Sequence, residues 1–128
     1  MWMDYDNDGD LDLYISKCRI GVSNSSDPRR VNMLWQNDGN NNYTEVAEQA
    51  NLKIGGQTWF SDFGDIDNDG DLDAIVVNHY EAPNLMRNNG DGTFTEITSG
   101  SGIPSLTSQS NLAIQGFFKD FNNDGYLD

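Results

Sequence analysis

The chain has 128 residues, which is enough for one small domain, and 36% of them are hydrophobic. Its 21 acidic and 7 basic residues give a formal net charge of −14, which argues against nucleic acid and anionic membranes as partners, because both bind through Lys and Arg. Cys18 is the single cysteine, so an internal disulfide and a cysteine-based zinc site are excluded. No apolar run approaches the roughly 20 residues that a membrane span needs.

The first predicted element is an entry strand at residues 1–3, which runs directly into a loop with an acidic residue at every second position. The loop reads Asp4-Tyr5-Asp6-Asn7-Asp8-Gly9-Asp10-Leu11-Asp12. Calcium takes about six to eight oxygen ligands, which alternate residues of a short loop can supply, and the glycine permits the turn that brings them together. The pattern therefore predicts a calcium-binding loop.

Short apolar, β-rich runs bounded by turn residues predict further strands along the chain. The expected strands are residues 11–16, 33–36, 43–46, 58–63, 72–77, 85–87, 94–97 and 116–119. A polar insertion at 17–31 separates the first two of these strands, and Arg29 and Arg30 are expected at its solvated tip. The nearest candidate for a helix, residues 45–52, is short, so an all-β fold is predicted.

The Asp-rich loop occurs three times, at residues 4–12, 65–73 and 120–128. Each copy has side-chain oxygens at positions 1, 3, 5 and 9, glycine at position 6, and a backbone carbonyl expected to bind at position 7. Up to three Ca²⁺ ions are expected, and the third loop is expected to bind more weakly because an asparagine replaces one carboxylate. The candidate ligands are Asp4, Asp6, Asp8, Asp10 and Asp12; Asp65, Asp67, Asp69, Asp71 and Asp73; and Asp120, Asn122, Asp124, Tyr126 and Asp128.

A second motif follows the first two loops at an equivalent place. The segment Asn37–Val46 aligns position for position with Asn88–Ile97, and each begins with a turn rich in Asn and Gly. The insertion at 17–31 accounts for the greater length of the first repeat. Two motifs that recur in the same order, with about four short strands per repeat, are typical of propeller blades.

On these motifs the chain resembles the FG-GAP/VCBS repeats of integrin-α-like β-propellers, and more narrowly the propellers related to cartilage acidic protein. The Asp-rich loops, Phe63-Gly64-Asp65 and the stretch from Asn88 to Phe94 match that family. The resemblance implies a partial β-propeller of about two four-stranded blades plus the start of a third. The blade repeats are expected at about 1–57 and 58–112, with the third starting at 113–128. Because family members have more blades, a fragment of a longer propeller is expected, packed against other blades of its own or of neighbouring chains.

Other interpretations use the same loop residues. An EF-hand or dockerin loop needs an acidic ligand at position 12 and flanking helices, whereas position 12 is Ile15 in the first copy and Val76 in the second, both in predicted strands. A metal-free Asp-Gly hairpin turn is another, and three copies with the same oxygen spacing argue against it. Magnesium is less suited than calcium to a site built from protein oxygens alone.

The sequence predicts a non-catalytic, calcium-binding propeller segment that serves adhesion, recognition of a carbohydrate or protein ligand, or structural assembly. No catalytic constellation stands beside the loops, and a nucleophilic Cys18 would need the only histidine, His79, placed beside it. Two alternatives stay open. One is a subunit of a self-assembling extracellular fibre or ring that neighbouring copies complete. The other is a fragment of a propeller attached to a polysaccharide-active enzyme.

An extracellular or cell-surface location is predicted from the loops. Weak calcium sites fill at the millimolar calcium concentration found outside cells. The missing signal peptide is then expected to reflect a truncated N-terminus. Asn24 and Asn42 are candidate glycosylation sites, because each begins an Asn-x-Ser/Thr sequence in a predicted turn.

Overall fold

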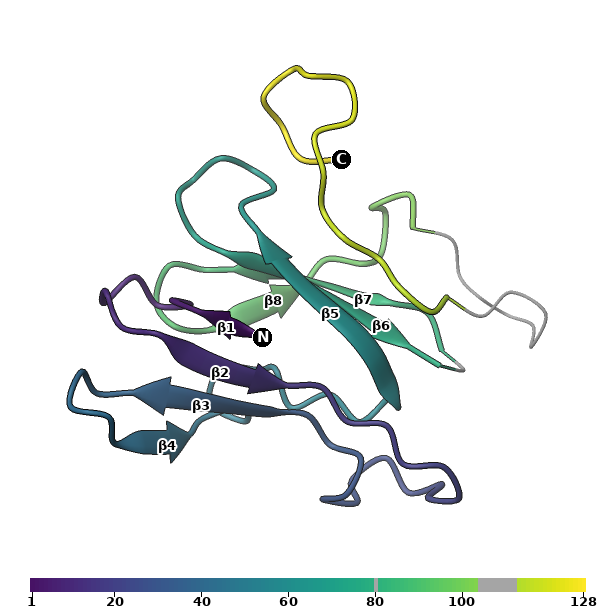
Figure 1. The fold of residues 1–128 in the computed structure, drawn as a ribbon. Coiled ribbons are helices and arrows are strands. Elements are labelled where there is room, and N and C mark those ends of the chain that lie inside the picture. The colour runs from purple at the N-terminus through teal and green to yellow at the C-terminus, as the bar shows by residue number, and fades with distance from the viewer. Residues whose placement is uncertain (80, 104–112) are drawn as a thin grey trace.

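The computed structural model describes residues 1–79, 81–103 and 113–128, and it consists of two four-stranded antiparallel sheets (Figure 1). In each sheet the strands neighbour one another in chain order. The first sheet contains β1 (Trp2–Met3), β2 (Asp12–Ile15), β3 (Met33–Asn37) and β4 (Tyr43–Glu45). The second contains β5 (Thr58–Gly64), β6 (Asp73–Asn78), β7 (Asn84–Asn88) and β8 (Phe94–Glu96). The all-β prediction is confirmed.

The two sheets share one pairing register. The residue before each of the first two Asp-rich loops pairs with the last residue of that loop, Met3 with Asp12 and Gly64 with Asp73. The Asn-Gly turns close their hairpins in the same way, because Asn37 pairs with Tyr43 as Asn88 pairs with Phe94. The sequence repeat is therefore a repeat of strand pairing.

One hydrophobic core lies between the two sheets. Tyr14 and Leu34 of the first sheet and Met86 and Phe94 of the second are buried in it, and the Tyr14 ring meets Phe63 edge-on at 5.4 Å between ring centroids. The backbone N–H of Phe94 also donates to the carbonyl of Ala50, 2.9 Å away, in the turn that follows β4. Burial of these apolar side chains is the main contribution that holds the sheets together.

The third repeat begins differently from the prediction. No strand is assigned at 116–119 or elsewhere in residues 113–128. Lys119 and Asp128 still exchange two backbone hydrogen bonds, of 3.5 and 3.1 Å, at the places equivalent to Met3 and Asp12. The N–H of Phe118 donates to the Asp62 carboxylate, 3.0 Å away. A single pair of residues gives no ladder, so the segment lies on the second sheet without forming a strand.

One expectation about the insertion is corrected, and the short helix candidate is not a helix. Arg30 is buried instead of solvated, because its guanidinium donates to the carbonyls of Val22 and Ser23 at 3.0 and 3.2 Å and lies 3.8 Å from the Glu81 carboxylate. The helix candidate at 45–52 is a turn, in which the N–H groups at 50 to 52 donate to nearby carbonyls. In the described ranges, no helix is long and apolar enough to cross a membrane.

Candidate metal centre

The three Asp-rich loops follow one another along one edge of the molecule, from the purple loop through the teal loop to the yellow loop in Figure 1. Each loop has a left-handed residue at position 4 and another at position 6. Position 6 is the glycine that was expected to permit the turn, and its φ lies between 90° and 95°. Position 4 is asparagine in all three copies, which tolerates this conformation better than other non-glycine residues. The residues at position 4 are Asn7, Asn68 and Asn123, with φ of 59°, 59° and 67°.

The first aspartate of each loop is held by the backbone of its own loop. One carboxylate oxygen accepts the N–H of position 5, and the other accepts the N–H of the glycine. The acceptors are Asp4 (3.1 and 3.0 Å), Asp65 (3.1 and 3.0 Å) and Asp120 (3.2 and 3.0 Å). The Gly125 amide is the main cause that lowers the pKa of Asp120. These bonds give the three loops one backbone shape from local sequence alone.

The last aspartate of the first two loops is fully buried and joins the loop to the following hairpin. Asp12 accepts the N–H of Tyr5 at 3.2 Å and the N–H of Asn37 at 2.8 Å. Asp73 likewise accepts the N–H of Ile66 at 3.0 Å and that of Asn88 at 2.8 Å. In both of these repeats, the last aspartate of the Asp-rich loop is thus tied to the first residue of the Asn-Gly turn.

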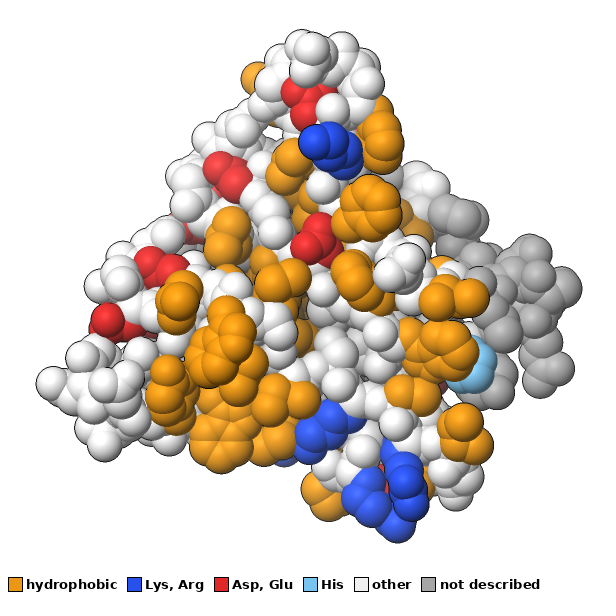
Figure 2. All heavy atoms as spheres, in the orientation of Figure 1, with side chains coloured by type: hydrophobic (Ala, Val, Ile, Leu, Met, Phe, Trp, Pro, Cys, Tyr) orange, Lys and Arg blue, Asp and Glu red, His pale blue; other side chains and the backbone are white. Residues whose placement is uncertain are grey.

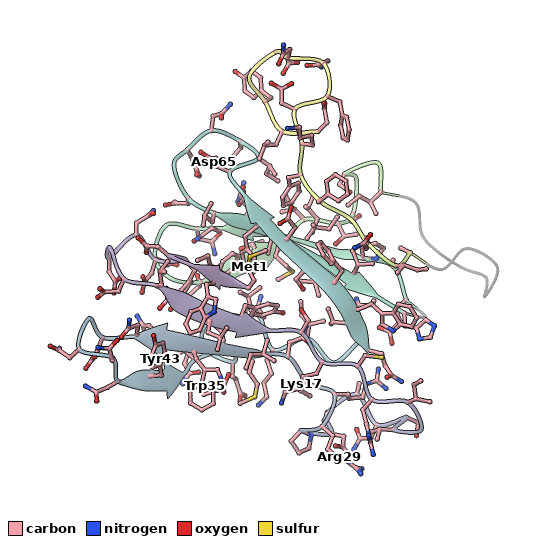
Figure 3. The ribbon with its side chains drawn as sticks, viewed as in Figure 1. Met1, Lys17, Arg29, Trp35, Tyr43 and Asp65 are labelled. Carbon is pink, nitrogen blue, oxygen red and sulfur yellow. The ribbon has the colours of Figure 1, made fainter. Side chains whose placement is uncertain are left out.

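Three carboxylates converge in each of the first two loops. One oxygen from each of Asp4, Asp6 and Asp8 lies within 4.8 Å of the other two, and the same holds for Asp65, Asp67 and Asp73. These are the two acidic groups in the described part of the chain that could hold a metal ion. Figure 3 labels Asp65 at the base of the second loop.

The donors of the first loop fit a cation. The Oδ2 atom of Asp6 accepts a hydrogen bond from Gln36 Nε2 at 2.6 Å, whereas its Oδ1 atom is buried and has no hydrogen-bond partner. Burial raises the pKa of Asp6, and the charges of Asp8 and Asp4 raise it further. An orphaned, desolvated carboxylate oxygen beside two more carboxylates is unfavourable unless a cation completes it.

The second loop offers a similar donor set, in which the buried Asp73 takes part directly. Burial is the main cause that raises the pKa of Asp73, and the charges of Asp67 and Asp69 add to it. The carboxylate of Asp71 does not belong to this group of three. It accepts the side-chain amide of Asn7 instead, at 2.6 Å. The expected role of the Asp71 carbonyl in binding metal stays a prediction.

The third loop has the same shape but a different environment. Asp128 is exposed and accepts the N–H of Phe121 at 2.9 Å, the equivalent of the Tyr5 and Ile66 bonds. The side-chain amide of Asn122 donates to Asp124 at 3.0 Å. Its predicted ligands, like those of the other loops, stay predictions.

Neighbouring loops are linked through the asparagine at position 4. The Nδ2 atom of Asn7 lies 3.4 Å from the Gly70 carbonyl of the second loop, and that of Asn68 lies 3.4 Å from the Gly125 carbonyl of the third. This asparagine was not among the predicted site residues, although the glycine at position 6 was part of the predicted pattern. The signal was available, since position 4 is asparagine in every copy.

The remaining candidate residues lie away from the loops. Asn24 and Asn42 are both exposed, and the Asn42 side chain donates to Asp38 at 3.0 Å. Cys18 and His79 both contact Trp59, whose indole N–H donates to the cysteine sulfur at 3.1 Å and whose ring centroid lies 4.1 Å from that of His79.

Comparison with known families gives one result. The family model described as the FG-GAP-like repeat matches residues 4–76 and again residues 65–128. Each match begins at the first aspartate of a loop and extends through the next loop, so together they cover nearly the whole chain. Searches of curated proteins and of solved structures give no match.

Proposed function

Because the chain belongs to the FG-GAP-like repeat family, we propose that it is a calcium-binding segment of an extracellular β-propeller that serves recognition or assembly and has no catalytic activity. The observation that carries the proposal is the first loop, where carboxylate oxygens of Asp4, Asp6 and Asp8 lie within 4.8 Å of one another and Asp6 also has a buried oxygen without a hydrogen-bond partner. The same loop backbone recurs twice more along the same edge.

Calcium fits the donor set better than other common cations. All candidate ligands are oxygens, and the loops offer several carboxylates each without a nitrogen or sulfur ligand. Asp4, Asp6 and Asp8 would hold the ion in the first loop, and Asp65, Asp67 and Asp73 in the second. A bound cation would supply the positive charge that these carboxylates lack, so that metal binding contributes directly to the free energy of folding.

The two four-stranded sheets support the propeller part of the proposal. They stack through one core, repeat the same register, and continue into a segment that starts a third repeat on the far side of the second sheet. In this account each sheet is one blade, and residues 113–128 begin another. The resemblance to the propellers of the cartilage acidic protein group is the finer form of this proposal.

The extracellular location follows from the kind of site. Short, partly exposed loops bind calcium weakly enough to respond to the millimolar concentrations found outside cells. The exposed positions of Asn24 and Asn42 are compatible with glycosylation there. A carbohydrate or protein is the expected ligand of the assembled propeller.

Equilibrium unfolding in urea, with millimolar calcium chloride or with chelator, tests the proposal. We expect calcium to raise the free energy of unfolding by about 2.7 kcal/mol for each occupied site when its concentration is about 100 times the dissociation constant. Magnesium at the same concentration should stabilise less. Asp6→Asn should lose the share of the calcium effect that the first loop contributes, whereas the matched variant Glu48→Gln, which removes one charge at an exposed residue outside the Asp-rich loops, should keep the whole effect. Identical unfolding curves in calcium and in chelator would overturn the proposal.

A further inference from the structure

The first two Asp-rich loops contact each other through one side chain. Asn7, at position 4 of the first loop, places its amide nitrogen 2.6 Å from the carboxylate of Asp71 and 3.4 Å from the carbonyl of Gly70 in the second loop. Figure 2 shows acidic side chains that follow one another along the edge that carries the loops. Because a hydrogen bond to a charged group is stronger than one between neutral groups, the contact with Asp71 is the stronger of the two links.

Asn7 stands between two of the carboxylates that are proposed to hold calcium in the first loop. Asp6 precedes it and Asp8 follows it, and both belong to the acidic group of that loop. When Asp6 and Asp8 hold a cation, they fix the backbone on both sides of Asn7. The position of the Asn7 amide therefore depends on whether the first loop is occupied.

Asp71 is the residue of the second loop whose backbone carbonyl is expected to bind calcium. Its carboxylate is held from two sides. Asn7 donates to the Oδ1 atom, and the Oδ2 atom lies against Gly90 of the following hairpin turn, where an added Cβ atom would come within 2.8 Å of it. The N–H of Asp71 donates to Asp69, 3.0 Å away. These contacts limit the orientations that Asp71 can take, and with them the direction of its carbonyl.

The contact between the second and third loops lacks the carboxylate. Asn68 is the equivalent of Asn7, and its amide nitrogen lies 3.4 Å from the Gly125 carbonyl. The equivalent of Asp71 is Tyr126, which is 57% exposed and offers no carboxylate. The chain therefore contains the same asparagine twice, once with and once without a charged acceptor in the next loop.

We propose that Asn7 is a positioning residue through which the first two loops bind calcium with positive cooperativity. Occupation of the first loop fixes the Asn7 amide, and this amide holds Asp71 in place. Part of the ordering that the second loop needs is then complete before it binds an ion, so its affinity is higher. By thermodynamic linkage, the first loop gains affinity by the same factor. The inference rests on the proposed calcium function and concerns the regulation of its sites.

Nitrogen–proton correlation spectra recorded while calcium is added stepwise test this coupling. Gly9, Gly70 and Gly125 each donate to the first aspartate of their own loop, so their signals report the three loops separately. Asp6→Asn, which weakens binding in the first loop, should raise the calcium concentration that half-saturates the Gly70 signal by about fivefold or more. In a chain that also carries Asn7→Gly, Asp6→Asn should change this concentration much less.

Matched variants isolate the contribution of the amide. Glycine adopts the φ of 59° found at Asn7 without strain, and it is uncharged like asparagine, so Asn7→Gly leaves the charge repulsion between occupied loops unaltered. Asn68→Gly is the control, and it should leave the half-saturation of the Gly125 signal nearly unchanged. Asn7→Gly should not weaken the second loop further in an Asp71→Ala chain. It should still do so in an Asp71→Asn chain, which keeps an acceptor oxygen.

A measurement without metal completes the test. In chelator, Asn7→Gly should speed hydrogen exchange of the Asp71 amide, because the side chain that holds this residue is gone. Unchanged exchange, or an equal effect of Asp6→Asn on the Gly70 signal with and without Asn7, would overturn the inference and leave calcium binding intact. If none of the three glycine signals responds to calcium, the proposed function is overturned as well.

Discussion

The first two Asp-rich loops and the third share a sequence pattern and a backbone shape, but only the first two are closed over. In each of the three, asparagine at position 4 and glycine at position 6 adopt positive φ, and the first aspartate accepts the same two backbone amides. The last aspartate differs. Asp12 and Asp73 are fully buried under the next hairpin, whereas Asp128 is exposed.

This difference separates two causes of loop structure. The loop backbone is a local property, because the two amides that the first aspartate accepts belong to its own loop. Burial of the last aspartate is a tertiary property, because its second acceptor oxygen meets an N–H from the Asn-Gly turn of a later strand, Asn37 or Asn88. A loop can therefore have its metal-binding shape without the buried carboxylate that ties it to its sheet.

The largest expected effect comes from removing the last aspartate. Asp73→Ala leaves the N–H groups of Ile66 and Asn88 without an acceptor, so it should lower the free energy of unfolding by about 3 kcal/mol or more. Asp128→Ala is a surface change and should cost no more than about 0.5 kcal/mol. Urea unfolding in chelator measures both costs without a contribution from metal. An equal loss in the free energy of unfolding for the two variants would contradict the claim that only the first two loops depend on a buried last aspartate.

A smaller effect is expected at position 4. Alanine in the left-handed region is strained by roughly 1 to 2 kcal/mol, whereas glycine is not. Asn68→Ala should therefore be less stable than Asn68→Gly by about this amount in global unfolding. The pair Asn123→Ala and Asn123→Gly should differ instead in hydrogen exchange of the Gly125 amide, since the exposed third loop opens without unfolding the sheets. A large difference in global unfolding for the Asn123 pair would show that the third loop belongs to the cooperative core.

Much of the fold could be predicted because its signals are local. Alternating apolar runs, turn residues and the nine-residue loop predict eight strands after the first loop, and seven of these are present to within a few residues. The predicted strand at 116–119 is not formed, because a strand needs a ladder of paired residues and only Lys119 is paired, with Asp128. The burial of Arg30 could not be predicted either, because its acceptors Val22 and Ser23 and its partner Glu81 meet it only in the folded chain.

The sequence predicted which residues make up the candidate site, but not what each of them does there. The spacing identified every aspartate that converges in the first two loops. It gave no indication that Asp12 and Asp73 also accept hydrogen bonds from a later turn, because that contact joins segments separated by an insertion of variable length. The asparagine at position 4 was visible in the sequence, and its meaning follows only from the backbone angles.

The smallest expected effect is a pH dependence that differs among the loops. Burial is the main cause that raises the pKa of Asp12 and Asp73 above 3.8, whereas backbone amides lower that of Asp120. As pH falls from 7, protons should compete with calcium in the first two loops before they do so in the third. Calorimetric titrations at pH 7 and pH 5 should show that the ratio of the calcium affinity of the first two loops to that of the third loop becomes smaller at pH 5, by less than about tenfold. A larger ratio of these affinities at pH 5 than at pH 7 would contradict the claim that protons compete with calcium first in the first two loops.

Without calcium, the stability of the folded chain should change with pH in the opposite direction. A carboxyl group whose pKa is raised by folding favours the folded state in its protonated form. That contribution is present at low pH and is lost as pH rises through the folded pKa of Asp12 and Asp73. The stabilisation by calcium, measured as the difference between unfolding in calcium and in chelator, should therefore grow from pH 5 to pH 7.

The most direct test follows one amide in each loop during a calcium titration. Gly9, Gly70 and Gly125 occupy the same position, and each donates its N–H to the first aspartate of its loop. In nitrogen–proton correlation spectra, the Gly9 and Gly70 signals should shift and saturate at lower calcium concentrations than the Gly125 signal. Three signals that titrate together, or that do not respond to calcium at all, would contradict the account.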